Sequence, residues 1–101
     1  YLAMAVMLKA GLDGIKNKIE PGEQSTSNIY DMTNEERKGR GITSLPGDIK
    51  KAVKALKNDT LIRKTLGSHI FDHFVEAKEI EWDVYKTQVH QWELDQYLLT
   101  F

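Results

Sequence analysis

The residues best suited to chemistry are two histidines, His69 and His73, which lie four positions apart with Asp72 between them. On a helix this spacing puts both imidazoles on one face, as in a pair of metal ligands. The pattern lacks the glutamate that follows the first histidine of zinc proteases, and no third ligand lies nearby. Because two ligands make a weak metal site, an ordinary exposed helix face is the favoured interpretation.

A second motif, Gly11-Leu12-Asp13-Gly14, resembles the G-x-x-G loop with which KH domains hold a nucleic-acid backbone. Asp13 would put a negative charge where phosphate must lie, and the strands of that fold are missing. The net charge is -1, whereas nucleic-acid binders carry a basic excess. We therefore predict no nucleic-acid partner, and instead a helix whose small residues lie at a close contact.

Other chemical motifs are absent from the 101 residues. There is no phosphate-binding loop, no nucleophile elbow and no dinucleotide motif. Cysteine is absent, so neither a disulfide nor a thiolate site can form. The longest apolar run, residues 1–8, is too short to span a bilayer. The sequence thus predicts no catalytic residue and no membrane partner.

The elements that position these residues are predicted to be helices, since only two prolines interrupt the chain. Thr33 and Glu36 form a capping box, Asp48 can cap a helix, and Gly67 can end one. Residues 28–32 are predicted to be extended. Helical patterns cover residues 1–18, 33–39, 49–57, 60–66 and about 70–89, followed by a helical or frayed tail from Trp92. We predict an all-α fold, an irregular bundle of about five helices.

Charge is segregated along the chain. Residues 47–67 carry six basic and two acidic residues, a local +4, and residues 68–101 carry two basic and seven acidic residues, a local -5. We expect these segments to attract each other across a helix pair or a subunit contact. The apolar run at residues 1–8 covers every face of its helix, which is typical of a helix buried in a larger body. We therefore expect the chain to be a fragment of a longer protein.

Several segments together resemble type I glutamine synthetase, in its bacterial and archaeal Bacillus-like branch. Residues 10–18 read AGLDGIKNK, and residues 76–83 read EAKEIEWD. Further matching segments, in the same order, are YLAMAV at 1–6, NIYDM at 28–32, SLPG at 44–47, LGSHIF at 66–71 and TQVHQWE at 87–93. The resemblance covers essentially all of residues 1–101 and implies the C-terminal helical part of the catalytic domain.

The resemblance implies a function for the whole protein. It would be a cytoplasmic ligase that joins ammonia to glutamate through γ-glutamyl phosphate, using ATP and two divalent ions, Mg or Mn. The metal-binding and arginine motifs of the family lie before Tyr1. The 101 residues are therefore expected to be inactive alone, to hold no cofactor, and to serve packing and assembly of a homo-oligomer, the two-ring dodecamer.

The resemblance also assigns roles to single residues. Tyr30 lies where some branches carry an adenylylated tyrosine, but Ile29, Met32 and Thr33 depart from that pattern, so we expect Tyr30 to be unmodified. Glu81 would lie near a subunit boundary that senses feedback inhibitors. The terminal helix would reach the opposing ring, with its interface residues being His90, Trp92, Tyr97, Leu98 and Phe101.

The alternative is a protein of another class, a stand-alone helical interaction module. It would bind partners through one helix face, formed by Phe71, Val75, Trp82 and Tyr85.

Overall fold

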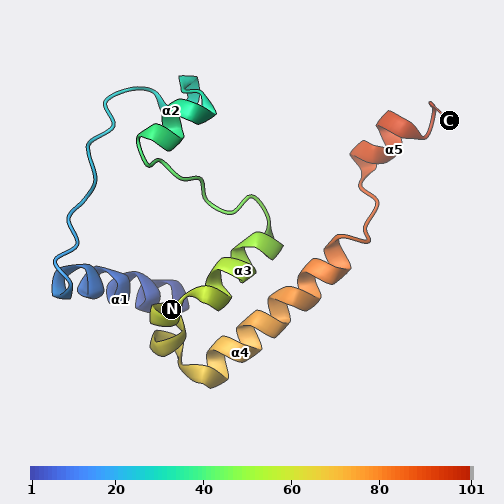
Figure 1. Cartoon of the computed structure of the whole chain (residues 1–101). Helices are drawn as coiled ribbons and strands as arrows, with labels where there is room; N and C mark the ends of the chain where they lie inside the picture. The colour runs from blue at the N-terminus through green and yellow to red at the C-terminus, as the bar shows by residue number, and fades with distance from the viewer. Residues whose placement is uncertain (101) are drawn as a thin grey trace.

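Helices account for all the regular structure in the computed structural model, which describes residues 1–100 (Figure 1). No strand occurs in that range. The elements are α1 (Leu2–Lys16), the 3₁₀ helix η1 (Ile29–Asp31), α2 (Asn34–Gly39), α3 (Ile49–Asn58), α4 (Thr60–Tyr85) and α5 (Gln91–Tyr97). The predicted all-α fold of about five helices is confirmed. Phe101 lies outside the described residues.

Side-chain caps fix three of the helix starts. The Thr33 hydroxyl accepts from the Glu36 N–H at 3.2 Å, and the Thr33 N–H donates to the Glu36 carboxylate at 2.7 Å. Both halves of the predicted capping box are therefore present. The Asp48 carboxylate accepts from the backbone N–H of Lys51, in the first turn of α3, at 2.7 Å. The Asp59 carboxylate accepts from the backbone N–H of Ile62, in the first turn of α4, at 2.9 Å. These bonds satisfy N–H groups that a helix start leaves without partners.

The same hydrogen bonds favour the charged carboxylates. The backbone N–H of Thr33, and then its hydroxyl, hold the pKa of Glu36 below its ordinary value. The backbone N–H of Lys51 is the main cause that lowers the pKa of Asp48. Both carboxylates thus act as helix caps in their ionised form.

Two predicted elements differ in the structure. Residues 28–32 are not extended throughout, because Ile29–Asp31 form a 3₁₀ turn. Asn28 stabilises that turn: its side chain accepts from the Tyr30 N–H at 3.2 Å and donates to Asp31 at 2.8 Å. The longest helix ends at Tyr85 instead of near Val89, and a turn separates it from α5.

Gly67 interrupts α4, as the sequence predicted. Its φ of 75° and ψ of 157° are not helical and lie in a region that essentially only glycine adopts. Helix continues on both sides, so residues 60–66 and 68–85 are two rods that meet at an angle (Figure 1). Because of this bend, both α1 and α3 can pack against α4.

The core lies where α3 packs on the second rod of α4. Its buried residues are Val53 of α3 and Phe71 and Val75 of α4. Phe71 is only 2% exposed. Partly buried side chains surround them, namely Ile49, Leu56 and Leu66. Helix α1 also packs on α4.

The chain is more extended than an ordinary domain of its length. Its radius of gyration is 18.8 Å, whereas a compact domain of about 100 residues has one of about 13 Å. Helix α2 lies between two long loops, and α5 lies beyond the far end of α4, away from α1 and α3 (Figure 1). Much apolar surface is therefore left uncovered.

Candidate functional site

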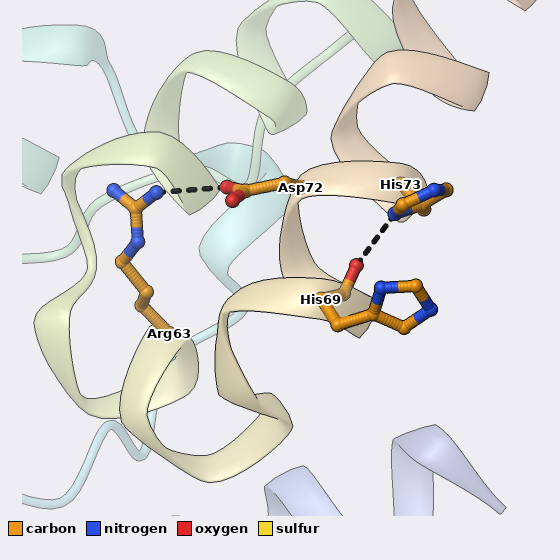
Figure 2. Close-up of polar contacts among 4 residues, drawn as sticks. All are labelled: Arg63, His69, Asp72 and His73. Carbon is orange, nitrogen blue, oxygen red and sulfur yellow. Dashed lines mark hydrogen bonds and ion pairs between the residues drawn. The ribbon is translucent and has the colours of Figure 1, made fainter.

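The two candidate metal ligands lie on one face of α4, just after the Gly67 break. Figure 2 shows the imidazoles of His69 and His73 one helical turn apart. Their ring centroids are 4.4 Å apart, with the ring planes tilted by 46°. His73 Nδ1 lies 2.8 Å from the His69 carbonyl oxygen. Both side chains are exposed to solvent.

Asp72, the carboxylate between them, points away from the histidines (Figure 2). It forms an ion pair of 2.8 Å with Arg63, which lies on the first rod of α4. The arginine also lies over the ring of Phe71, with 4.7 Å from its guanidinium carbon to the ring centroid. Asp72 is therefore paired with Arg63 and does not join His69 and His73 as a third metal ligand.

A divalent-metal site of the kind implied by the resemblance is absent from residues 1–100. They contain no group of three or more histidine, cysteine, aspartate or glutamate side chains that could hold an ion. Mg²⁺ requires several oxygen ligands in near-octahedral geometry. The described residues therefore do not fit the magnesium or manganese ions of a ligase.

The G-x-x-G motif is not a loop. Gly11 and Gly14 both lie inside α1, so the backbone cannot clamp a phosphate as a KH loop does. The predicted close contact at these glycines is wrong within this chain, because a Cβ at either position would meet nothing within 4 Å. Their surroundings in the chain are open.

Predicted interface residues lie on and around α5. Trp92 and Leu98 are 64% and 70% exposed, and Tyr97 is also exposed. The rings of Trp92 and Tyr97 meet edge to face at 6.1 Å. We call Trp92, Tyr97 and Leu98 the tail surface. His90 precedes α5, and its N–H donates to Glu93 at 2.8 Å. Phe101, the last predicted interface residue, is outside the described residues.

The two candidate regulatory residues lie far apart in the sequence and in different elements. Tyr30 is in η1 and is 95% exposed. Glu81 is on the exposed surface of α4, where Lys78, one turn earlier, forms an ion pair with it. The structure does not bring the two into one site.

An apolar groove lies between α1, α3 and α4, with a cavity volume of about 500 Å³. Its walls carry almost no polar atoms and are formed by Tyr1, Leu2, Ala3, Val6, Leu56, Ile62, Leu66 and Phe74. On α1, further large apolar side chains are exposed, including Met4, Met7 and Ile15. These exposed side chains agree with the prediction that the start of this helix is apolar on every face.

The helix face that the alternative interpretation assigned to partners is not free. Phe71 and Val75 are 2% and 6% exposed, because they form the core with α3. Only Tyr85 of that set is exposed, and Trp82 is half-buried. The prediction of one four-residue binding face is therefore wrong.

Charge segregation is confirmed as a contact between the two charged segments. Lys57 of α3 pairs with Glu79 of α4, and Arg63 pairs with Asp72. Sequence reasoning missed the position of Arg63 over Phe71. The sequence shows that Arg63 lies four positions before Gly67. It does not show the angle of the bend, which brings Arg63 over the Phe71 ring.

Comparison with known proteins places the chain in a family. Residues 1–97 match the family model described as glutamine synthetase, catalytic domain. The chain is 53% identical over 98 residues to a glutamine synthetase of Methanosarcina mazei, covering 97% of this chain and 22% of that protein. It is 50% identical over 101 residues to the glutamine synthetase of Thermus thermophilus, covering 100% and 23%. A Staphylococcus aureus glutamine synthetase is 50% identical over 98 residues, covering 97% and 22%.

The chain belongs to the glutamine synthetase catalytic-domain family. It spans less than a quarter of the length of the curated relatives that it matches. Within residues 1–100, none of the helices has the length and apolar character needed to cross a membrane.

Proposed function

We propose that residues 1–101 are the C-terminal helical part of the catalytic domain of a type I glutamine synthetase of the Bacillus-like branch. The family match over residues 1–97 is the observation that carries this proposal. The small share of each relative that the chain covers supports its being one part of a longer ligase. The uncovered apolar side chains of α1 support the same view, since such a helix is normally enclosed by other residues.

The full-length protein then makes glutamine from glutamate and ammonia, with ATP consumed and γ-glutamyl phosphate formed on the way. ATP and Mg or Mn ions supply phosphoryl transfer, in which metal ions and arginines neutralise the developing charge. The residues described here do not fit those metal ions. We therefore assign the chemistry to the remainder of the protein, and expect this chain to be inactive alone.

The role of this chain is packing and assembly of a cytoplasmic homo-oligomer, the dodecamer of the family. The tail surface supports this role, because Trp92, Tyr97 and Leu98 are exposed together at one end of the chain. Aromatic residues grouped on an exposed patch are typical of protein interfaces. Phe101 and His90 would join the same contact. Tyr30 and Glu81 are proposed as regulatory positions, with Tyr30 unmodified in this branch.

The activity is tested with the full-length protein that contains this chain. Its coding sequence upstream of Tyr1 should carry the metal-binding and arginine motifs of the family. The purified protein should release phosphate from ATP only when glutamate and ammonia are both present, and form glutamine in equal amount. A folded full-length protein that releases no phosphate under these conditions would contradict the proposal.

The assembly role is tested separately, in the same protein. Leu98→Asp places a charge on the tail surface, and Gln96→Asp adds the same charge to α5 without removing an apolar side chain. Light scattering should show that Leu98→Asp forms smaller particles, whereas Gln96→Asp assembles normally. If both variants assemble as the unchanged protein does, α5 is not an assembly element.

A further inference from the structure

We propose that His69 and His73 form a two-imidazole binding site for a transition-metal ion on the exposed face of α4. The ions that fit are Cu²⁺, Ni²⁺ and Zn²⁺, which imidazole binds well, and not Mg²⁺, which prefers oxygen ligands. The site lies outside the ligase chemistry proposed above. It does not rest on that proposal, since the argument uses only these two side chains and their neighbours.

The placement of the rings is the first reason. Their centroids are 4.4 Å apart on adjacent turns of one rigid helix. An ion bound by two imidazoles lies about 2.0–2.1 Å from each nitrogen, so two rings this close can be bridged by small side-chain rotations. No backbone movement is needed, and the exposure of both residues leaves the ion free to enter from solvent.

The hydrogen bond of His73 is the second reason. A backbone carbonyl can only accept, so the Nδ1 atom that lies 2.8 Å from the His69 oxygen is the nitrogen that donates a proton (Figure 2). The neutral ring then has its lone pair on Nε2. Ligating histidines commonly donate their other nitrogen to a carbonyl in this way, which fixes the tautomer and the ring orientation. His73 is therefore arranged as a ligand before any ion arrives.

The position of Asp72 defines the ligand set. Because its carboxylate is bound to Arg63 on the other side of the helix, it does not add an oxygen ligand. An ion held here would have two imidazole nitrogens and complete its coordination with water. For a nitrogen site without geometric constraint, affinity rises from Ni²⁺ to Cu²⁺ and falls again at Zn²⁺. We thus expect Cu²⁺ to bind most tightly.

The test uses the full-length protein with excess Mg²⁺ present, so that oxygen-rich sites are occupied. Cu²⁺ is titrated by calorimetry, and electron paramagnetic resonance reports the number of nitrogens bound to the ion. His69→Gln and His73→Gln should each lower the Cu²⁺ affinity of one class of site at least about tenfold. Loss of a residue that only hydrogen-bonds to a metal ligand already lowers metal affinity roughly 10–100-fold. In each variant the nitrogen coupling of that site should fall from two imidazole nitrogens to one.

Two matched controls make the outcome specific. His90→Gln removes the remaining histidine of this chain, which lies before α5 and beside Tyr85, and should leave Cu²⁺ binding unchanged. Asp72→Asn removes the adjacent carboxylate and should also leave Cu²⁺ binding unchanged. Unchanged affinity in both His69→Gln and His73→Gln would overturn the proposal. So would a loss in Asp72→Asn as large as that in His73→Gln, because the carboxylate would then be a ligand. Circular dichroism confirms that each variant keeps its helices.

Discussion

Arg63 and Asp72 form an ion pair of 2.8 Å that spans the break at Gly67 (Figure 2). The guanidinium also lies over Phe71, so one side chain contacts both a surface carboxylate and the ring at the centre of the core. This arrangement ties the first rod of α4 to the second. It also keeps Asp72 away from the two histidines on the neighbouring face.

The first prediction concerns this contact. Asp72→Asn removes the charge but leaves Arg63 over Phe71, and should lower the free energy of unfolding by up to about 1 kcal/mol, as exposed ion pairs do. Arg63→Gln also removes the cation–π contact, which adds about 0.5–1 kcal/mol at exposed sites. Urea unfolding should therefore rank Arg63→Gln as the less stable variant. Equal losses in the two variants would show that the stacking contributes nothing.

The second prediction concerns Gly67. Because its backbone lies in a region essentially limited to glycine, Gly67→Ala should cost about 1–3 kcal/mol. Space is not the cause, since a Cβ would meet nothing within 4 Å. Gly11→Ala is the matched control: it too has open space but lies inside a helix, and should stabilise the chain by about 0.5–1 kcal/mol. Thermal unfolding followed by circular dichroism measures both, and a neutral Gly67→Ala would refute the strain argument.

The third prediction concerns the core. Phe71→Ala leaves a cavity where the ring was 2% exposed, and should lower the free energy of unfolding by about 3–5 kcal/mol. Phe74 lies three residues after Phe71 on the same helix but is 38% exposed. Phe74→Ala should therefore cost clearly less in the same urea titration. A larger loss at Phe74 would mean that the groove between α1, α3 and α4 is the true centre of packing.

The fourth prediction is a pH dependence. The folded state lowers the pKa of Glu36 from 4.5, because the charged carboxylate accepts hydrogen bonds from Thr33. Its contribution to α2 is therefore fully present above the unfolded pKa, about 4.5, and is lost as the pH falls through the lower folded value. Carboxyl NMR titration of Glu36 measures this shift.

Thr33→Ala separates the two causes of the Glu36 shift. The variant removes the hydroxyl donor but keeps the backbone N–H, which is the larger cause. The Glu36 pKa should therefore recover only part of the way towards its ordinary value. Full recovery would show that the hydroxyl alone holds the carboxylate.

Local features of the fold follow from the sequence. The caps at Thr33 and Asp48 and the break at Gly67 depend on residues within a few positions of each other, so side-chain chemistry alone predicts them. The 3₁₀ turn at Tyr30 was missed, because it depends on two hydrogen bonds of Asn28 that no periodicity reveals.

The candidate sites were less predictable, because they depend on how helices meet. The spacing of His69 and His73 predicted a shared face. It did not predict that Asp72 would turn towards Arg63, since that direction is set by the angle at Gly67. The burial of Phe71 and Val75 likewise depends on which side of α4 receives α3.

The bend at Gly67 also has a consequence for the order of folding. Helix α3 is followed almost directly by α4, so their contact at Val53 and Phe71 closes only a short loop. Helix α1 reaches the first rod of α4 across the whole segment 17–59, which costs more chain entropy. Contacts between near neighbours in the sequence form faster than distant ones. The α3–α4 hairpin should therefore form first, and α1 should dock late onto the corner that the bend provides.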